Sequence, residues 1–198
     1  MPPTYSEVEA KARAAAAAHL PAHPAQAARA AIALAESVLA ECAAGPLKDR
    51  LAELQCGPGC TPCCHQAVGV TLAELALVAD SVAALPGPVQ AGVRQRSAAL
   101  RRVATGLDVA GWWRARLACP LLDGDGTCLV HAARPLPCRA MNSADAGICR
   151  RSFAGEADQI PVLAAQHGIM GRAQAGLAQA LAAAGLDHRP VALGTGLG

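Results

Sequence analysis

Four cysteines stand within nine residues of the segment CGPGCTPCCHQ, which covers residues 56–66. Two of them, Cys63 and Cys64, are adjacent, whereas glycine, proline and threonine separate the others. Because Gly and Pro interrupt regular elements, the segment is expected to be a loop rather than a helix or an ordinary strand. The four closely spaced thiols are therefore expected to interact with a chemical partner other than the packed face of a helix.

A second group of cysteines lies more than fifty residues further along the chain, in the stretch between residues 119 and 149. This stretch also holds three prolines and three glycines, too many for long regular elements. The residues between the two groups show helical periodicity. We expect the helices to bring both groups to the same place.

Three interpretations of the cysteines compete. A disulfide framework is disfavoured because the N-terminal sequence predicts no secretory signal, so a cytoplasmic protein with reduced thiols is expected. Adjacent Cys63 and Cys64 also cannot pair without strain. Burial in an apolar core suits only Cys42, which lies on the apolar stripe of a predicted helix. Metal binding fits the others, because zinc and iron–sulfur clusters are both commonly held by four thiolates.

The periodicity elsewhere predicts a mostly α fold. Apolar stripes indicate helices near residues 24–44, 71–85, 89–104 and 158–184, and Thr71 with Glu74 predicts a capping box. We expect a small helical domain in which two cysteine-rich loop segments converge on a metal site. The expected divisions are an N-terminal helical region (1–45), a cysteine-cluster metal-binding domain (46–155), a C-terminal helix packed on it (156–185) and a flexible tail (186–198).

Composition disfavours several other functions. The formal net charge of +2 and the four aromatic residues argue against nucleic acid as a partner, and the small charge also argues against an anionic membrane. No segment has the run of about 18 apolar residues that a membrane span needs. The chain also lacks a P-loop, a Rossmann glycine pattern and HExxH.

The order of the motifs resembles the YkgJ-like cysteine-cluster family. The matching features are the Cys56–Cys64 run, Cys119-Pro120-Leu121-Leu122, Gly126 with Cys128, Arg134-Pro135, and Cys138-Arg139. His131 departs from the pattern, since relatives often have tyrosine there. The resemblance implies a zinc- or iron-chelating domain with zinc or iron, including a 4Fe-4S cluster, as the cofactor. The candidate metal ligands are Cys56, Cys60, Cys63, Cys64, Cys119, Cys128, Cys138 and Cys149.

Eight thiols could form two four-thiolate sites, and adjacent Cys63 and Cys64 favour different centres or a polynuclear one. The negative charge of such a centre would need hydrogen-bond donors and cations around it. The candidates are Arg134, Arg139, Arg150 and Arg151, of which Arg139 is preferred. His65 and His131 are interpreted as hydrogen-bonding neighbours, and the DGDGT segment as a turn rather than a calcium loop.

Two functions stay open at this point. In the first, the metal organises a helical domain for an unidentified protein partner or for metal handling. In the second, the chain is an iron–sulfur redox or catalytic protein. Flagellin lysine N-methylases contain a similar cysteine cluster, so the second function could belong to a protein-modifying, methyl-transfer-related system. A closed set of four sulfurs would favour structure, and an open coordination position would favour catalysis.

Overall fold

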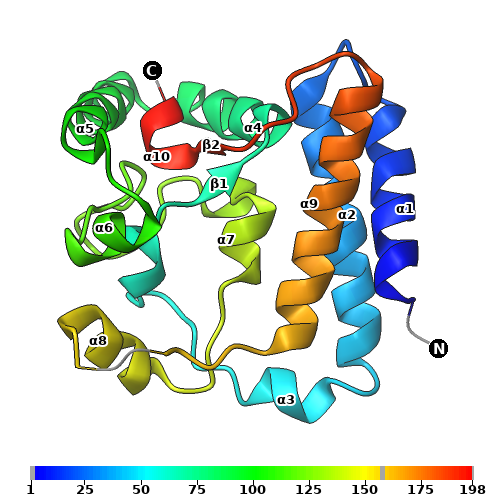
Figure 1. The fold of residues 1–198 in the computed structure, drawn as a ribbon, viewed down its shortest axis with the longest axis horizontal. Coiled ribbons are helices and arrows are strands. Elements are labelled where there is room, and N and C mark those ends of the chain that lie inside the picture. Colours follow the sequence, from blue (N-terminus) through cyan, green and yellow to red (C-terminus); the bar gives the residue numbers. More distant parts are fainter. Residues whose placement is uncertain (1–2, 157–158, 198) are drawn as a thin grey trace.

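Three long helices, α1 (Tyr5–Ala17), α2 (Pro24–Ala43) and α9 (Ala164–Ala183), lie side by side along one flank of the molecule (Figure 1). This arrangement comes from a computed structural model that describes residues 3–156 and 159–197. The buried faces of α1 and α2 consist largely of alanine. Alanine favours helix formation and leaves little side chain between the axes, so the three helices can pack closely.

The remaining elements, most of them shorter, extend from this layer towards the cysteine-rich segments. They are α3 (Lys48–Ala52), η1 (Pro62–His65), β1 (Gly69–Val70), α4 (Leu72–Ala83), α5 (Gly87–Ala104), α6 (Val109–Arg114), η2 (His131–Ala133), α7 (Leu136–Ala140), α8 (Ala146–Ala154), β2 (Val191–Ala192) and α10 (Leu193–Gly196). Figure 1 shows α7 between the long helices and the side that carries α6 and α8. The mostly α fold class is therefore confirmed, with two cysteine-rich segments lying outside the long helices.

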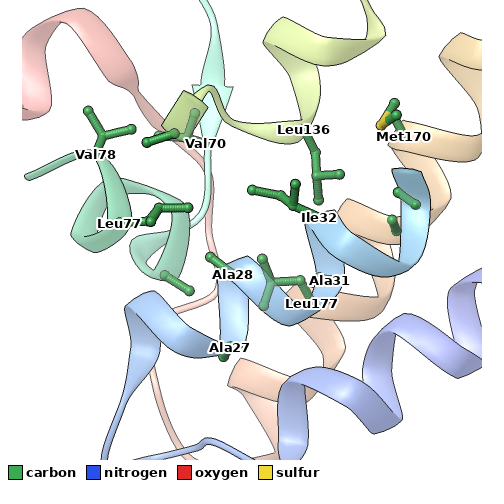
Figure 2. Packing of buried hydrophobic residues seen from close by; sticks show 14 of the residues in the cluster. Ala27, Ala28, Ala31, Ile32, Val70, Leu77, Val78, Leu136, Met170 and Leu177 are labelled. Atoms are coloured by element: carbon green, nitrogen blue, oxygen red, sulfur yellow. The ribbon is translucent and has the colours of Figure 1, made fainter. Parts of the chain in front are cut away.

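The hydrophobic core joins α7 to the long helices. Figure 2 shows Leu136 of α7 beside Ile32 of α2, and both side chains are almost completely buried. Leu177 of α9 lies at the same core, and Cys42 at the end of α2 is buried in it as expected. Because α7 carries Cys138, its anchorage here positions one of the candidate ligands.

A buried carboxylate fastens the same helix. The Glu74 side chain is fully buried and accepts the Thr71 backbone N–H at 2.8 Å, which forms the predicted capping box of α4. Its second oxygen, Oε1, accepts the backbone N–H of Leu136 at 2.9 Å, and Gln174 of α9 donates to the first oxygen, Oε2, at 2.9 Å. Glu74 thus links α4, α7 and α9.

The structure corrects the expected flexible tail. Residues 191–192 pair antiparallel with β1, and the Leu193 backbone N–H donates to the Val68 carbonyl at 2.9 Å. Leu193 and Leu197 are buried, and Ser97 donates to the Gly194 carbonyl at 2.8 Å. The segment has no periodicity of its own because its order comes from these partners on β1 and α5.

The C-terminal helix begins later than expected. It starts at Ala164 instead of near residue 158, and its main contacts are with α1, α2 and α7. Of the helices described by the structure, none is both long and apolar enough to cross a membrane.

Candidate metal centre

The first cysteine run forms a series of tight turns. Gly59 adopts a φ of 81°, and the Cys60 backbone N–H donates to the Gly57 carbonyl at 3.1 Å. Pro62 then opens the single turn η1, which contains both Cys63 and Cys64. The glycines and prolines therefore bend the chain so that four thiols stay close together, as the composition of the run predicts.

The second segment meets this run directly. The Cys119 backbone N–H donates to the Cys64 carbonyl at 2.8 Å, and a bridge between Leu122 and Cys128 forms a short hairpin. The turn of this hairpin, residues 123–127, is capped by the Asp125 carboxylate, which accepts the Thr127 backbone N–H at 2.9 Å. The DGDGT segment is thus a turn between two candidate ligands.

Five cysteines from both segments line one cavity of about 60 Å³. They are Cys63, Cys64, Cys119, Cys128 and Cys138. The rest of the wall is mainly apolar and includes Val68, Leu121 and Leu193, together with the side chains of Trp112 and Arg134. The fold therefore places most of the candidate ligands around one enclosed space.

Of the other three candidate ligands, Cys56 and Cys149 lie beside the buried Ser143. The Ser143 backbone N–H donates to the Cys56 sulfur at 3.2 Å. Ser143 also interacts with Cys149, and Cys60 interacts electrostatically with Cys56 and Cys149. Cys63 interacts with members of both groups, whereas Cys64 interacts with Cys63 and with the second segment.

An aromatic contact fastens α8, which carries Cys149, to the first run. The ring of Phe153 lies 4.5 Å from that of His65 and 5.7 Å from that of Trp113, measured between centroids. The guanidinium of Arg116 stands over the same ring at 5.5 Å. Three of the four aromatic residues lie in this region, in agreement with a structural role for His65 beside the cysteines.

Burial controls the ionisation of the thiols. It raises the pKa of Cys119 to about 11 and also raises the pKa of Cys138 and Cys128. A hydrogen bond between Cys63 and Cys64 raises the pKa of Cys63 and lowers that of Cys64. A bound cation reverses this effect because coordinated thiols lose their protons.

Two residues that line this cavity each carry a buried N–H group with no acceptor among the described residues. These groups are Nε1 of Trp112 and Nε of Arg134. Such groups are rare in native structures, because an unpaired buried donor costs free energy. A metal bound by thiolates would place charged sulfur acceptors in the cavity, so the donor set and these two N–H groups fit a metal–thiolate centre.

The sulfur atoms do not yet form a coordination shell. In the described ranges, no group of three or more Cys, His, Asp or Glu side chains is arranged to hold a metal ion. The backbones of the two segments meet, as the bond from the Cys119 N–H to the Cys64 carbonyl shows, but the thiols themselves form no such group. Within the same ranges all nine cysteines are free thiols.

The roles of the arginines differ from those expected. Arg139, the preferred neighbour of the centre, forms an ion pair with Glu36 and donates to the backbone carbonyls of Arg134 and Ala132. Arg134 instead lines the cavity. The sequence could not separate the two because the direction of each side chain depends on how η2 and α7 pack.

A comparison with protein families matches residues 55–160, which is more than half of the chain, to the CxxCxxCC model described as "Putative zinc- or iron-chelating domain". The match covers every candidate ligand and confirms the family that the motif order indicates. Neither the curated proteins nor the solved structures include a match to the chain.

Proposed function

This chain belongs to the CxxCxxCC family of zinc- or iron-chelating domains, and we propose that bound zinc or iron organises its cysteine-rich half. The observation that carries the proposal is a cavity lined by five cysteines from two distant segments and by two residues whose buried N–H groups lack acceptors in the described part of the chain. A reducing compartment such as the cytoplasm would keep these thiols free for metal.

The proposed ligands fall into two groups that meet at η1. Cys64, Cys119, Cys128 and Cys138 form the group at the cavity. Cys56, Cys60 and Cys149 form the second group, in which Cys56 and Cys149 lie beside Ser143, and Cys63 interacts with members of both groups. Adjacent thiols on one turn would then serve different centres or bridge them.

Metal binding would supply the stability that this region otherwise lacks. Thiolate zinc sites contribute about 10–16 kcal/mol, whereas whole domains are stable by about 5–15 kcal/mol. The stretch between Cys119 and Cys149 has short elements and few large buried side chains of its own. Its order should therefore depend on the metal more than that of the long helices.

The size of the cavity favours an iron–sulfur centre as the second candidate. A cavity needs about 10–15 Å³ to hold one water molecule. The cavity here measures about 60 Å³. A polynuclear cluster would fill more of that space than a single zinc ion. Redox or catalytic use, including a part in a protein-modifying system, would rest on such a cluster.

Anaerobic purification followed by metal analysis and a visible spectrum tests both candidates. Stoichiometric zinc in a colourless protein would support the structural zinc site. Brown protein with iron and acid-labile sulfide would support the cluster. Protein that takes up neither metal would contradict the proposal.

The variant Cys63→Ala provides the matching test of the site, with Cys42→Ala as its control. Cys63 lines the cavity, whereas Cys42 is buried in the helical core away from it. Cys63→Ala is expected to lose metal and to melt at lower temperature, by about 2–4 °C for each kcal/mol lost. Cys42→Ala should keep its full metal content despite some loss of stability. Equal metal content in both variants would remove Cys63 from the ligands.

A further inference from the structure

We propose that Trp112 Nε1 and Arg134 Nε donate hydrogen bonds to sulfur atoms of the metal centre in the cavity. This inference rests on the proposed function, because the acceptors it names are metal-bound thiolates or cluster sulfides. It assigns these two residues as positioning residues for the centre, a role that no motif in the sequence marks for Trp112.

The position of Trp112 is set by the elements around it. Asp108 caps α6 by accepting the Gly111 backbone N–H at 2.6 Å, and Trp112 follows in the first turn with only 6% of its surface exposed. The far wall is α10, where a Cβ on Gly194 would lie 3.7 Å from Trp112 Cζ2. The indole of α6 therefore packs against the C-terminal segment and lines the cavity, and its N–H group is buried without an acceptor among the described residues.

Arg134 approaches the cavity from another direction. It stands between η2 and α7, and no ion pair among the described residues involves it. It lines the same cavity as Cys63, Cys128 and Cys138. A guanidinium in a cavity wall that also carries thiols, with a buried Nε that has no acceptor among the described residues, is suited to an anionic sulfur site.

The chemistry of sulfur explains why these donors require metal. A neutral thiol is a weak acceptor, whereas a thiolate or sulfide carries negative charge and accepts a stronger bond. Four thiolates on a divalent ion carry a net charge of about −2, which one guanidinium and one indole N–H would partly offset. Both donors would thus favour the metal-loaded state over the metal-free state.

Nuclear magnetic resonance of protein loaded with NMR-active cadmium(II) tests the bond from Trp112. The chain has two tryptophans, so Trp113→Phe leaves one indole signal and assigns it. We expect the Trp112 indole proton to show scalar coupling to cadmium through the N–H···S bond and to exchange more slowly with solvent than in metal-free protein. This measurement needs no change at Trp112 itself.

Binding measurements with cadmium(II) provide the second readout. Trp112→Phe and Arg134→Lys are expected to weaken binding about tenfold or more, as partners of metal ligands typically do. Trp113→Phe and Arg94→Lys are the controls, because Trp113 packs against Phe153 and Arg94 is exposed on α5. Both controls should bind within about twofold of the unmodified protein, well below the effect at the positioning residues.

The outcomes separate this inference from the proposed function. If the unmodified chain binds no cadmium, zinc or iron, the proposed function fails. If it binds metal but shows no coupling to the indole proton, and Trp112→Phe binds as Trp113→Phe does, the inference about Trp112 fails while metal binding stands. Unchanged affinity in Arg134→Lys would likewise overturn the role of Arg134.

Discussion

Gly126 is a residue at which the two cysteine-bearing segments lie in close contact. It adopts a φ of 81°, and a Cβ there would lie 3.3 Å from Gly59 Cα and 3.2 Å from Thr61 Cγ2. Gly59 and Thr61 belong to the first cysteine run. The missing side chain therefore allows the hairpin to rest directly on the turns that present the other thiols.

Gly126→Ala is expected to destabilise the protein and weaken metal binding. The substitution combines a left-handed backbone, which costs about 1–3 kcal/mol for such residues, with a steric push between the segments. Gly124→Ala in the same turn is the control, since nothing lies within 4 Å of its added Cβ. Thermal melting and metal titration of both variants test this. Equal melting temperatures would show that the close contact is unimportant.

At the scale of elements, two capping boxes of the same type differ in their surroundings. Thr4 with Glu7 begins α1 at the exposed surface, whereas Thr71 with Glu74 begins α4 in the interior. Glu74 also accepts the N–H at the start of α7, and Glu7 has no such additional helix to hold. The local sequence thus predicts both caps equally well but not their unequal importance.

Glu74→Ala should be far more destabilising than Glu7→Ala. Each bond to a buried charged group is worth about 1.5–3 kcal/mol, and the change would remove acceptors from Thr71, Leu136 and Gln174 together. Loss of Glu7 from the exposed cap should cost much less, because its partners in that cap are open to solvent. Denaturant unfolding of the two variants measures the difference. Similar losses would contradict a linking role for Glu74.

Two glycines of α9, Gly171 and Gly176, also differ in their surroundings. A Cβ on Gly176 would collide with the backbone carbonyl of Glu9 in α1, whereas a Cβ on Gly171 meets nothing within 4 Å. Gly176→Ala is therefore expected to separate α1 from α9 and to destabilise the protein. Gly171→Ala should stabilise it by about 1 kcal/mol, the helix propensity difference. Calorimetry of the two variants measures their stability. If both substitutions stabilised the protein, α1 would be able to shift freely away from α9.

Sequence reasoning succeeded where the signal is local. The helices near residues 24–44 and 71–85 and the Thr71–Glu74 box follow from periodicity and capping, and the turns of the first cysteine run follow from Gly and Pro. It failed where a partner decides the structure. Residues 191–197 become ordered only against β1 and α5, and Trp112 becomes a cavity residue only because α10 closes the opposite wall.

At the scale of the whole molecule, stability has two sources in different places. The core of α1, α2, α4 and α9 buries apolar side chains continuously, and α7 connects this core to the cysteine-rich side. That side has short helices, half-buried thiols and two buried donors that lack acceptors in the described chain. The helical core is stabilised by the polypeptide alone, whereas the cysteine-rich side is expected to need a bound metal.

Removal of metal is therefore expected to loosen one side of the molecule and leave the other folded. Amide hydrogen exchange in chelator-treated, reduced protein should show lost protection in residues 119–149, while α1, α2 and α9 keep theirs. The physical reason is that local opening follows the contacts of each region, and the long helices bury their faces against one another. Because α7 is held by both Glu74 and the core, protection should decline across it from Leu136 towards Cys138. Uniform loss throughout the chain would indicate one cooperative unit, and unchanged protection would mean that metal does not order the cysteine-rich segments.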